Sequence, residues 1–309
     1  MKKVVIAGGS GFLGQSLAKS LIAQGYDVVL LGRVQKQNPQ QVGRLVPWDG
    51  RTVGEWVGEL ENAKAVFNLA GRSIDCRHTK DNRDLILHSR IDSTRALGKG
   101  ISSCHTPPPV WLNASTASIY KDIRGQAPAH DESSPGDAVG FLEDVGRAWE
   151  KEFFGHQREG IRQVAMRISI ILGEEGGAFP VMKRFTQLGL GGTQGPGTQW
   201  MSWLHLDDWV EVAKFLMEHP DVSGPVNLAS PYPVTNQVFM QEMRKCFAPL
   251  GIGFPAPTPG IHLGAFILGT SPELVLKSIK VNPLKIGSSG YNFVYPEISR
   301  ALSSFTPKK

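Results

Sequence analysis

The sequence predicts an α/β fold in which helices cover both faces of a parallel β-sheet. An apolar run at residues 4–7 leads into a glycine-rich turn, and apolar residues at helical spacing follow that turn. Strand-like and helix-like segments then alternate as far as residue 172, which is typical of a parallel sheet. Beyond that point glycine and proline become frequent. These three observations predict a Rossmann-like doubly wound parallel sheet with a smaller C-terminal substrate lobe.

The first β-α-β unit carries the strongest functional pattern in the chain. Gly8, Gly11 and Gly14 follow the first strand in a G-x-x-G-x-x-G pattern, and an amphipathic helix and a second strand at 28–31 come next. A glycine turn lets the backbone approach a pyrophosphate closely, and the first N–H groups of the helix then point at it. The unit therefore predicts dinucleotide binding, although such a turn can also join a strand to a helix without any ligand.

The end of the second strand indicates which dinucleotide binds. Gly32 and Arg33 stand there, and no acidic residue lies about 20 residues past the glycines, where NAD sites place one. A carboxylate would bind the 2′-hydroxyl of the ribose and repel a 2′-phosphate, whereas Arg33 would bind that phosphate through charge-assisted hydrogen bonds. We therefore expect NADP(H), and the alternative is that Arg33 is simply solvated.

The remaining elements follow from apolar runs and from helical spacing. Further buried strands are expected at 45–49, 65–71, 110–116, 164–172 and 225–229. Helices are expected at 84–101, 141–158, 179–188, 209–217, 237–247 and near 272–279. Asp207 or Asp208 can cap the helix at 209–217, and Thr235 can cap the one at 237–247.

Loops and domains complete the expected organisation. The polar segment 35–44 predicts a loop, and 121–140 predicts a long surface loop over the site. Residues 1–172 plus 206–230 are expected to form the NADP-binding domain, and residues 173–205 plus 231–309 the smaller substrate lobe.

Composition excludes several classes of partner. The net charge of +5 is mild, and the basic residues are scattered rather than gathered into a nucleic-acid surface. Three cysteines far apart suggest neither a disulfide framework nor a metal site. No apolar run is long enough to cross a membrane, and the chain enters its first strand directly after Met1. We expect a cytoplasmic monomer or homodimer that binds a small-molecule substrate, without nucleic acid, membrane or metal.

Several ordered motifs resemble the extended short-chain dehydrogenase/reductase superfamily over the whole chain. They are GGSGFLG at 8–14, NLAG at 68–71, STASIY at 115–120 and GPGTQWMSWLHLDDW at 195–209. The Trp-Asp pair at 48–49, HSRIDSTRAL at 88–97 and GRAWEKEF at 146–153 are similar to the atypical "epimerase family" branch, which is NAD-dependent epimerase/dehydratase-like. This resemblance implies a Rossmann-like domain with a small C-terminal lobe, and NADP(H) binding.

The chain departs from that superfamily at two places. The usual catalytic pair is a Tyr-x-x-x-Lys motif, whose lysine lowers the pKa of the tyrosine for acid/base work near neutrality. The corresponding stretch, VGFLEDVGRAWEKEF at 139–153, has no tyrosine and no lysine before Lys151. Nucleotide-sugar epimerases often hold the diphosphate with an arginine where this chain has Met201.

Three functions are compatible with the resemblance and its departures. The first is an NADP(H)-dependent oxidoreductase of the atypical extended type, acting on a small carbonyl or alcohol compound that is not strongly anionic. The second is a non-catalytic NADP(H)-binding sensor or interaction protein. The third is a nucleotide-sugar epimerase, which rests on the family label and on fold analogy alone.

Candidate site residues lie at the carboxyl ends of the predicted strands, in the glycine turn and, for Arg90, on the helix that follows the cofactor-facing loop. The catalytic candidates are Ser115, Thr116 and Tyr120. Ser115 and Thr116 either bind the cofactor or a substrate carbonyl, or only cap the turn. The cofactor-binding candidates are Gly8, Gly9, Ser10, Gly11, Phe12, Leu13, Gly14, Gly32, Arg33, Leu69, Ala70, Gly71, Arg90, Ala114, Ser115, Arg167 and Ser169.

Four of the polar candidates have structural alternatives. Tyr120 corresponds to a non-catalytic tyrosine of the family, so packing or ribose contact competes with proton transfer. Arg90 either contacts phosphate or is exposed. Arg167 stands in an apolar strand, so it is either paired with a carboxylate or close to the cofactor. For His205, next to Asp207 and Asp208, a role in joining the two lobes is favoured.

Overall fold

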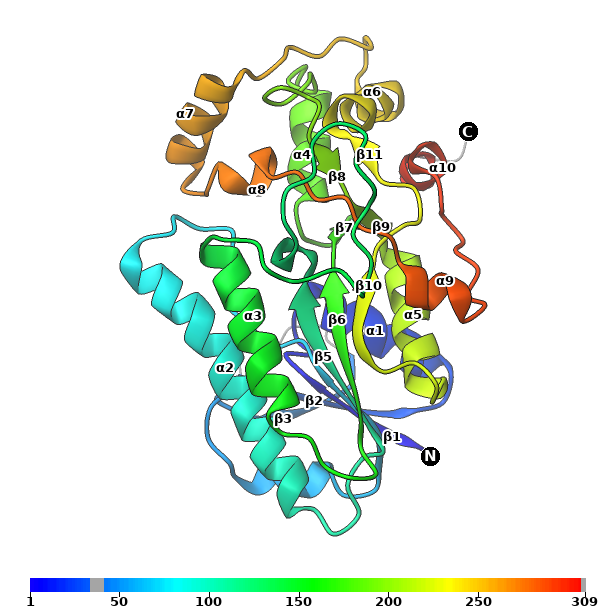
Figure 1. Cartoon of the computed structure of the whole chain (residues 1–309). Coiled ribbons are helices and arrows are strands. Elements are labelled where there is room, and N and C mark those ends of the chain that lie inside the picture. The colour runs from blue at the N-terminus through cyan, green and yellow to red at the C-terminus, as the bar shows by residue number, and fades with distance from the viewer. Residues whose placement is uncertain (34–41, 307–309) are drawn as a thin grey trace.

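The computed structural model describes residues 1–33 and 42–306 and confirms the α/β class (Figure 1). Seven strands form one parallel sheet in the order β10-β6-β5-β4-β1-β2-β3. The strands are β1 (Lys3–Ala7), β2 (Asp27–Gly32), β3 (Arg44–Pro47), β4 (Ala63–Asn68), β5 (Val110–Thr116), β6 (Arg162–Ile168) and β10 (Gly224–Leu228).

Helices cover both faces of this sheet, so its central strands read as continuous apolar runs. Figure 1 shows α2 (Lys80–Ser103) and α3 (Phe141–Phe154) side by side on one face, while α1 (Phe12–Ala23) and α5 (Leu206–Glu218) cover the other. Val4, Val5 and Ile6 are fully buried between these layers. Two short 3₁₀ helices, η1 (Glu55–Glu59) and η2 (Ala117–Ile119), complete this part of the chain.

The strand order reverses between β1 and β4. After β1 the chain adds β2 and β3 on one side, and β4 then pairs with the other side of β1. In sheets of this kind, ligands bind in the crevice outside the carboxyl ends of the strands at the reversal. The glycine turn after β1 and the segment after β4 both lie there.

The expected strand at 164–172 is wrong as a single element, because the chain leaves the main sheet at Ser169. β6 ends at Ile168, and β7 (Ile170–Leu172) pairs with β9 (Trp203–His205) in a separate two-stranded sheet. The backbone N–H and the hydroxyl of Ser169 both donate to the carbonyl of Leu228, the last residue of β10, at 3.1 and 2.8 Å.

The smaller lobe contains more helices than the sequence predicted. Thr235 caps α6 as expected, since its side chain accepts from the N–H of Val238. The helix expected near 272–279 is confined to α8, and α7, α9 and α10 were not predicted. The elements outside the main sheet are α4 (Phe179–Gln187), β8 (Trp200–Met201), β11 (Val234–Thr235), α6 (Asn236–Phe247), α7 (Thr258–Leu268), α8 (Glu273–Leu276), α9 (Leu284–Ser288) and α10 (Ile298–Ser303).

The domain division stays a prediction, but two packing facts bear on it. A separate apolar core joins α4, α6 and α10, with Phe179, Phe239 and Leu302 fully buried in it. Ile286 of α9 instead packs into the core of the main sheet. The predicted loop at 35–44 falls mostly on residues 34–41, which lie outside the described residues, and Arg44 already belongs to β3.

The start of α5 differs from the expectation and explains the two aspartates. The helix begins at Leu206, and its N-cap is His205, whose ring accepts from the N–H of Asp207 at 3.1 Å. Neither Asp207 nor Asp208 is therefore the cap. Burial lowers the pKa of His205 to about 4, which keeps the ring neutral and able to accept.

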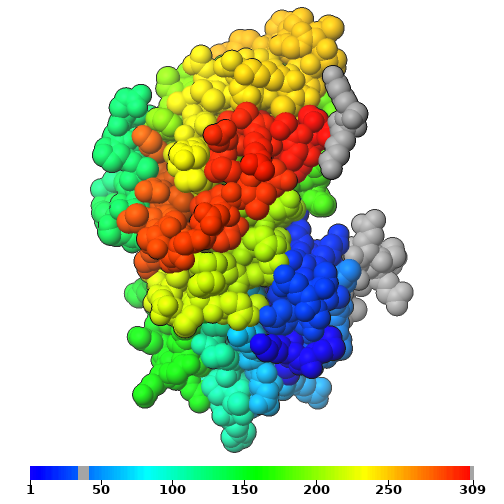
Figure 2. All heavy atoms as spheres, turned by 90° about the vertical axis from the view of Figure 1, so that its right-hand side faces the viewer, coloured from blue at the N-terminus to red at the C-terminus, as the bar shows by residue number. Residues whose placement is uncertain are grey.

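Asp208 fastens α5 to the C-terminal segment. It is fully buried, and its carboxylate accepts from the N–H groups of Val294 and Tyr295 at 2.8 Å each and from the Tyr291 hydroxyl at 3.1 Å. In Figure 2 the orange and red C-terminal residues lie over the yellow-green residues of α5. The aspartate therefore joins the two parts of the chain, as the sequence suggested.

We predict that Asp208→Ala lowers the free energy of unfolding by about 3 kcal/mol, because two buried N–H groups and a hydroxyl lose their acceptor. Urea denaturation measures the loss. Asp207→Ala is the matched control, since that side chain is 64% exposed, and it should cost less than about 1 kcal/mol. Equal losses in the two variants would contradict this role of Asp208.

Candidate functional site

The glycine turn after β1 leaves backbone groups free at the crevice. Gly8 has a φ of +74°, a conformation that L side chains rarely adopt, and a Cβ there would lie 2.7 Å from the backbone nitrogen of Ala70. A Cβ on Gly14 would lie 2.6 Å from the Cα of Gly9, so α1 packs directly on the turn. Ser10 and Gly11 form the exposed rim. These contacts require glycine at the first and last positions of the motif.

The N-terminus of α1 has the properties of an anion site. Its N-cap is Gly11, and within residues 1–33 and 42–306 no side chain caps it and no acidic residue stands in its first turn. The first N–H groups of a helix carry partial positive charge and attract phosphate when nothing else satisfies them. Phe12 packs its ring against the backbone of Gly173 and Gly176, where a Cβ would come within 2.8 Å of it.

The segment after β4 faces this turn. Asn68 is fully buried; its amide group donates to Asn113 at 2.7 Å, and its carbonyl accepts from the N–H of Ala70 at 3.1 Å. The asparagine therefore shapes the turn formed by Leu69 and Ala70, both of which are half-buried, while Gly71 is exposed. The structure thus brings the predicted residues of β1 and β4 together.

Arg90 of α2 lies over Gly71 at this edge. Its guanidinium carbon is 3.2 Å from the position of a Cβ on Gly71, it lies 5.0 Å from the ring centre of Trp149, and it donates to the carbonyls of Arg72 and Ile86. Burial lowers the pKa of Arg90 to about 10, and no carboxylate of the described chain pairs with it. A half-buried cation without an anionic partner favours an anionic ligand here.

Arg33 lies at the other end of the crevice. It is exposed at the end of β2 and lines a hollow of about 740 Å³ together with Trp48 and Trp56. Three carboxylates also line it, those of Asp49, Glu55 and Glu59, and the Glu59 carboxylate is bound by the guanidinium of Arg44 at 2.7 Å. Gly32, just before Arg33, lies beside the Ser10 hydroxyl, 3.6 Å from the position of a Cβ.

Two of the three predicted catalytic residues, Ser115 and Tyr120, enter a buried network rather than an open site. Ser115 is 5% exposed, and its hydroxyl donates to Glu150 of α3 at 2.6 Å. Arg167 of β6 donates twice to the same carboxylate, at 2.8 Å each, and once to the Tyr120 hydroxyl at 2.7 Å. The Tyr120 hydroxyl in turn donates to Asn227 at 2.9 Å.

This network gives Arg167 and Tyr120 partners inside the protein. Burial by itself lowers the pKa of Arg167, but the Glu150 carboxylate outweighs that effect and raises it. Tyr120 is fully enclosed, and burial raises the pKa of its hydroxyl although Arg167 opposes the change. A cofactor role for Arg167 and a proton-transfer role for Tyr120 stay predictions, and these contacts favour their structural alternatives.

The remaining candidates at the strand ends differ in accessibility. The Thr116 hydroxyl accepts from the N–H of Ser118 at 3.0 Å and is half-buried, so its own proton remains available at the edge of the sheet. The Ser169 hydroxyl is taken by the Leu228 carbonyl. Ala114 is 7% exposed and lies inside β5. Among the hydroxyl candidates Ser115, Thr116, Tyr120 and Ser169, Thr116 is the one that combines partial exposure with a hydroxyl that donates to no described residue.

The sequence missed the residue that organises this network. Glu150 stands in the predicted helix at 141–158, next to Trp149, but nothing local marks its carboxylate as buried. The signal that pointed to it was Arg167 in an apolar strand, since a buried arginine requires an anionic partner. Met201, which stands where related epimerases often have an arginine, is buried together with Trp203 in the core of the smaller lobe.

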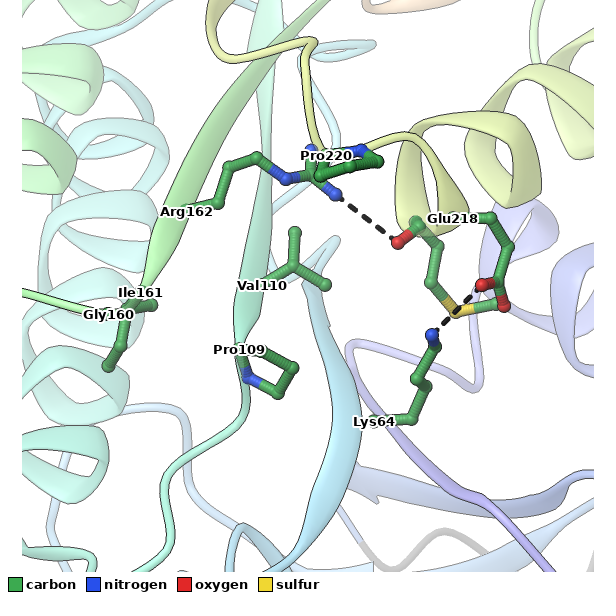
Figure 3. A pocket seen from close by; sticks show the side chains of 9 residues that line it. Lys64, Pro109, Val110, Gly160, Ile161, Arg162, Glu218 and Pro220 are labelled. Carbon is green, nitrogen blue, oxygen red and sulfur yellow. Dashed lines mark hydrogen bonds and ion pairs between the residues drawn. The ribbon is translucent and has the colours of Figure 1, made fainter.

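A second hollow of about 490 Å³ lies at the opposite edge, at the amino ends of β4, β5 and β6 (Figure 3). Its two cations already have partners. Lys64 pairs with Glu218 at 2.9 Å, and Arg162 donates to the carbonyls of Leu216 and Met217 in the last turn of α5. Both cations of this hollow therefore attach the C-terminal end of α5 to the sheet.

The described residues contain no group of three or more side chains suited to hold a metal ion, and no helix with the length and apolarity that a bilayer span requires.

Comparison with known proteins gives the family. The model of the NAD dependent epimerase/dehydratase family matches residues 4–229. The chain is 32% identical over 303 residues to the epimerase family protein YfhF of Bacillus subtilis, covering 97% of this chain and 96% of YfhF. It is 31% identical over 310 residues to the epimerase family protein SAB0724c of Staphylococcus aureus, covering 100% of both.

Solved structures agree with this result. The human epimerase family protein SDR39U1, solved with NADPH, is 29% identical and superimposes with a TM-score of 0.84 over 98% of each chain. UDP-N-acetylglucosamine 4-epimerase of Bacillus cereus has a TM-score of 0.75 at 17% identity, over 98% of this chain and 95% of its own, and so shows the fold alone. The chain belongs to the NAD dependent epimerase/dehydratase family, which confirms the resemblance to the atypical extended short-chain dehydrogenase/reductases.

We predict that Arg167→Met lowers the free energy of unfolding by about 3–5 kcal/mol, because it leaves the Glu150 carboxylate buried without its partner. The double variant Arg167→Met with Glu150→Leu, which removes both charges, should recover most of the lost free energy of unfolding. Urea denaturation measures both. The matched control is Arg95→Met, whose 46% exposed guanidinium pairs with Glu152 at 2.8 Å and should contribute less than about 1 kcal/mol. A loss no larger than that of the control would refute the claim that the buried Glu150 carboxylate depends on Arg167 for its charge compensation.

Proposed function

We propose that this member of the NAD dependent epimerase/dehydratase family is an NADP(H)-dependent oxidoreductase that acts on a small carbonyl or alcohol compound. The observation that supports it best is the cradle where the strand order reverses. There the uncapped N-terminus of α1 and the half-buried Arg90 both lack an anionic partner within the described chain. A pyrophosphate would satisfy both groups.

Arg33 supports NADP(H) over NAD(H). It is exposed on the rim of the hollow beside β2, which is where the adenosine end of a dinucleotide would lie if its pyrophosphate bound at the glycine turn. A 2′-phosphate there would gain charge-assisted hydrogen bonds from the guanidinium. The human relative SDR39U1, solved with NADPH, is consistent with this preference.

The reaction itself requires hydride transfer at the carboxyl end of β5. In this proposal the Thr116 hydroxyl donates a hydrogen bond to the substrate oxygen, and Ser115 holds the strand end in place through Glu150. No arginine stands at Met201, so a strongly anionic substrate would lack the cation that diphosphate sugars commonly use. This makes nucleotide-sugar epimerisation the weakest of the alternatives.

A non-catalytic NADP(H) sensor is the second candidate. The enclosure of Tyr120 favours it, because the hydroxyl of that residue already has two protein partners and no substrate can reach it. Saturable oxidation of NADPH by any carbonyl compound would remove this alternative.

We predict that wild-type protein binds NADPH at least about 10-fold more tightly than NADH, and that Arg33→Ala abolishes this preference by weakening NADPH alone, since one charged hydrogen-bonding site is lost. Arg90→Met should weaken both cofactors, because the pyrophosphate is common to them. Nucleotide fluorescence titrations measure the dissociation constants.

Arg51→Ala is the control, because its guanidinium is 70% exposed and pairs with Asp92. It should leave both affinities unchanged. The cofactor proposal fails if wild-type protein shows no saturable NADPH signal, or if NADH binds as tightly as NADPH.

A further inference from the structure

A buried ion pair joins the two lobes beside the carboxyl end of β5. Glu143 stands in the first turn of α3, and Lys277 follows α8 in the smaller lobe. Their side chains form an ion pair in which the glutamate is 3% exposed and the lysine 10%. Neither residue takes part in the Glu150–Arg167 network.

Glu143 carries an unused acceptor. Its Oε1 atom pairs with Lys277, but Oε2 is buried and has no hydrogen-bond partner among the described residues. The carboxylate folds back over Gly140, where a Cβ would lie only 2.3 Å from Oε2. Since buried carboxylate oxygens are normally satisfied, this atom points to a donor that is supplied from outside the chain.

Lys277 places this pair next to Thr116. Its ammonium donates to the carbonyl of Ser118 at 3.2 Å, and the N–H of the same serine donates to the Thr116 hydroxyl. Gly146, one helical turn after Glu143, also packs against Thr116, since a Cβ there would lie 2.8 Å from its methyl group. The pair therefore lies beside the hydroxyl that we propose contacts the substrate oxygen.

The charges around Lys277 come from two elements, α3 and the loop after η2. Glu143 faces it from α3, and Asp122 faces it from the loop after η2, where Arg124 donates to Asp122 at 3.1 Å. Burial lowers the pKa of Lys277, although Asp122 acts in the opposite direction. A lysine whose pKa is shifted toward neutrality is a more effective proton donor than one in water.

We propose that Lys277, held by Glu143, is the proton donor of the reductive reaction, replacing the absent Tyr-x-x-x-Lys pair. The inference rests on the proposed oxidoreductase function. Bound NADPH would supply the hydride for the new C–H bond and would become NADP+, while the carbonyl π electrons would move to oxygen. Lys277 then gives one ammonium proton to that oxygen, becomes a neutral amine, and takes a proton back from solvent.

The experiment follows NADPH-dependent reduction of phenanthrenequinone, an uncharged dicarbonyl probe, across a range of pH. Lys277→Met should lower kcat by at least about 100-fold with little change in NADPH affinity, because general acid catalysis contributes about that much. Lys277→Arg should give a similar loss while keeping the thermal stability of wild type, because a guanidinium keeps the ion pair but does not release its proton.

The pH profile separates catalysis from structure. In wild type kcat should fall as pH rises through the pKa of the ammonium, since only the protonated form donates. Glu143→Gln removes the carboxylate that stabilises the ammonium, so this fall should begin at lower pH. A carboxylate that only stabilises the first turn of α3 would leave the profile where it is. Lys280→Met, in the same segment, is the control and should match wild type.

Each outcome decides between the hypotheses. If wild type reduces the probe and Lys277→Arg retains kcat within about threefold with an unchanged pH profile, Lys277 is structural and only this inference fails. If wild type binds NADPH but reduces no probe, the oxidoreductase proposal fails and the inference fails with it. Loss of kcat in Lys277→Met and in Lys277→Arg, together with the shifted pH profile of Glu143→Gln, supports the inference.

Discussion

The backbone turns after β1 and after β4 approach each other closely. The rest of the structure depends on this contact. A Cβ on Gly8 would lie 2.7 Å from the nitrogen of Ala70, so only glycine allows the turns to meet. Because they meet, Ala7 and Asn68 pair at the very ends of their strands, and α1 begins directly beyond. The edge of the sheet there presents N–H groups and a helix N-terminus rather than side chains, and such a surface suits a phosphate.

Buried charge defines the neighbouring part of the same edge. Glu150 and Arg167 neutralise one another between α3 and β6, and through Ser115 and Tyr120 they tie together β5, β6 and β10. An ion pair of this kind stabilises little in net terms, because desolvation offsets the attraction, but it strongly disfavours any arrangement that separates the charges. It therefore fixes the positions of the strand ends. Glu143 and Lys277 do the same between the lobes, with one oxygen left unsatisfied.

Much of the main sheet could be predicted because its signals are local. The strands at 28–31 and 110–116, the glycine turn and the Thr235 cap depend on neighbours within a few residues, and the structure places them as expected. Other predictions were wrong for a physical reason. β6 ends at Ile168 because Ile170–Leu172 pairs with β9, far along the chain, instead of continuing in the main sheet, and His205 rather than an aspartate caps α5 because burial keeps its ring neutral. The short helices α9 and α10 have too few apolar repeats to be recognised from periodicity.

The sequence by itself predicted a nucleotide-binding turn, because the strand, the glycine spacing and the helix can all be recognised within consecutive residues. It also marked Arg167 as a cation in need of a partner. Only the tertiary structure decided which partner that is, that Tyr120 is enclosed, and that Lys277 from the smaller lobe meets Glu143 of α3. The reason is that burial and ion pairing depend on which distant segments of the chain come into contact, and a local sequence pattern does not show those contacts.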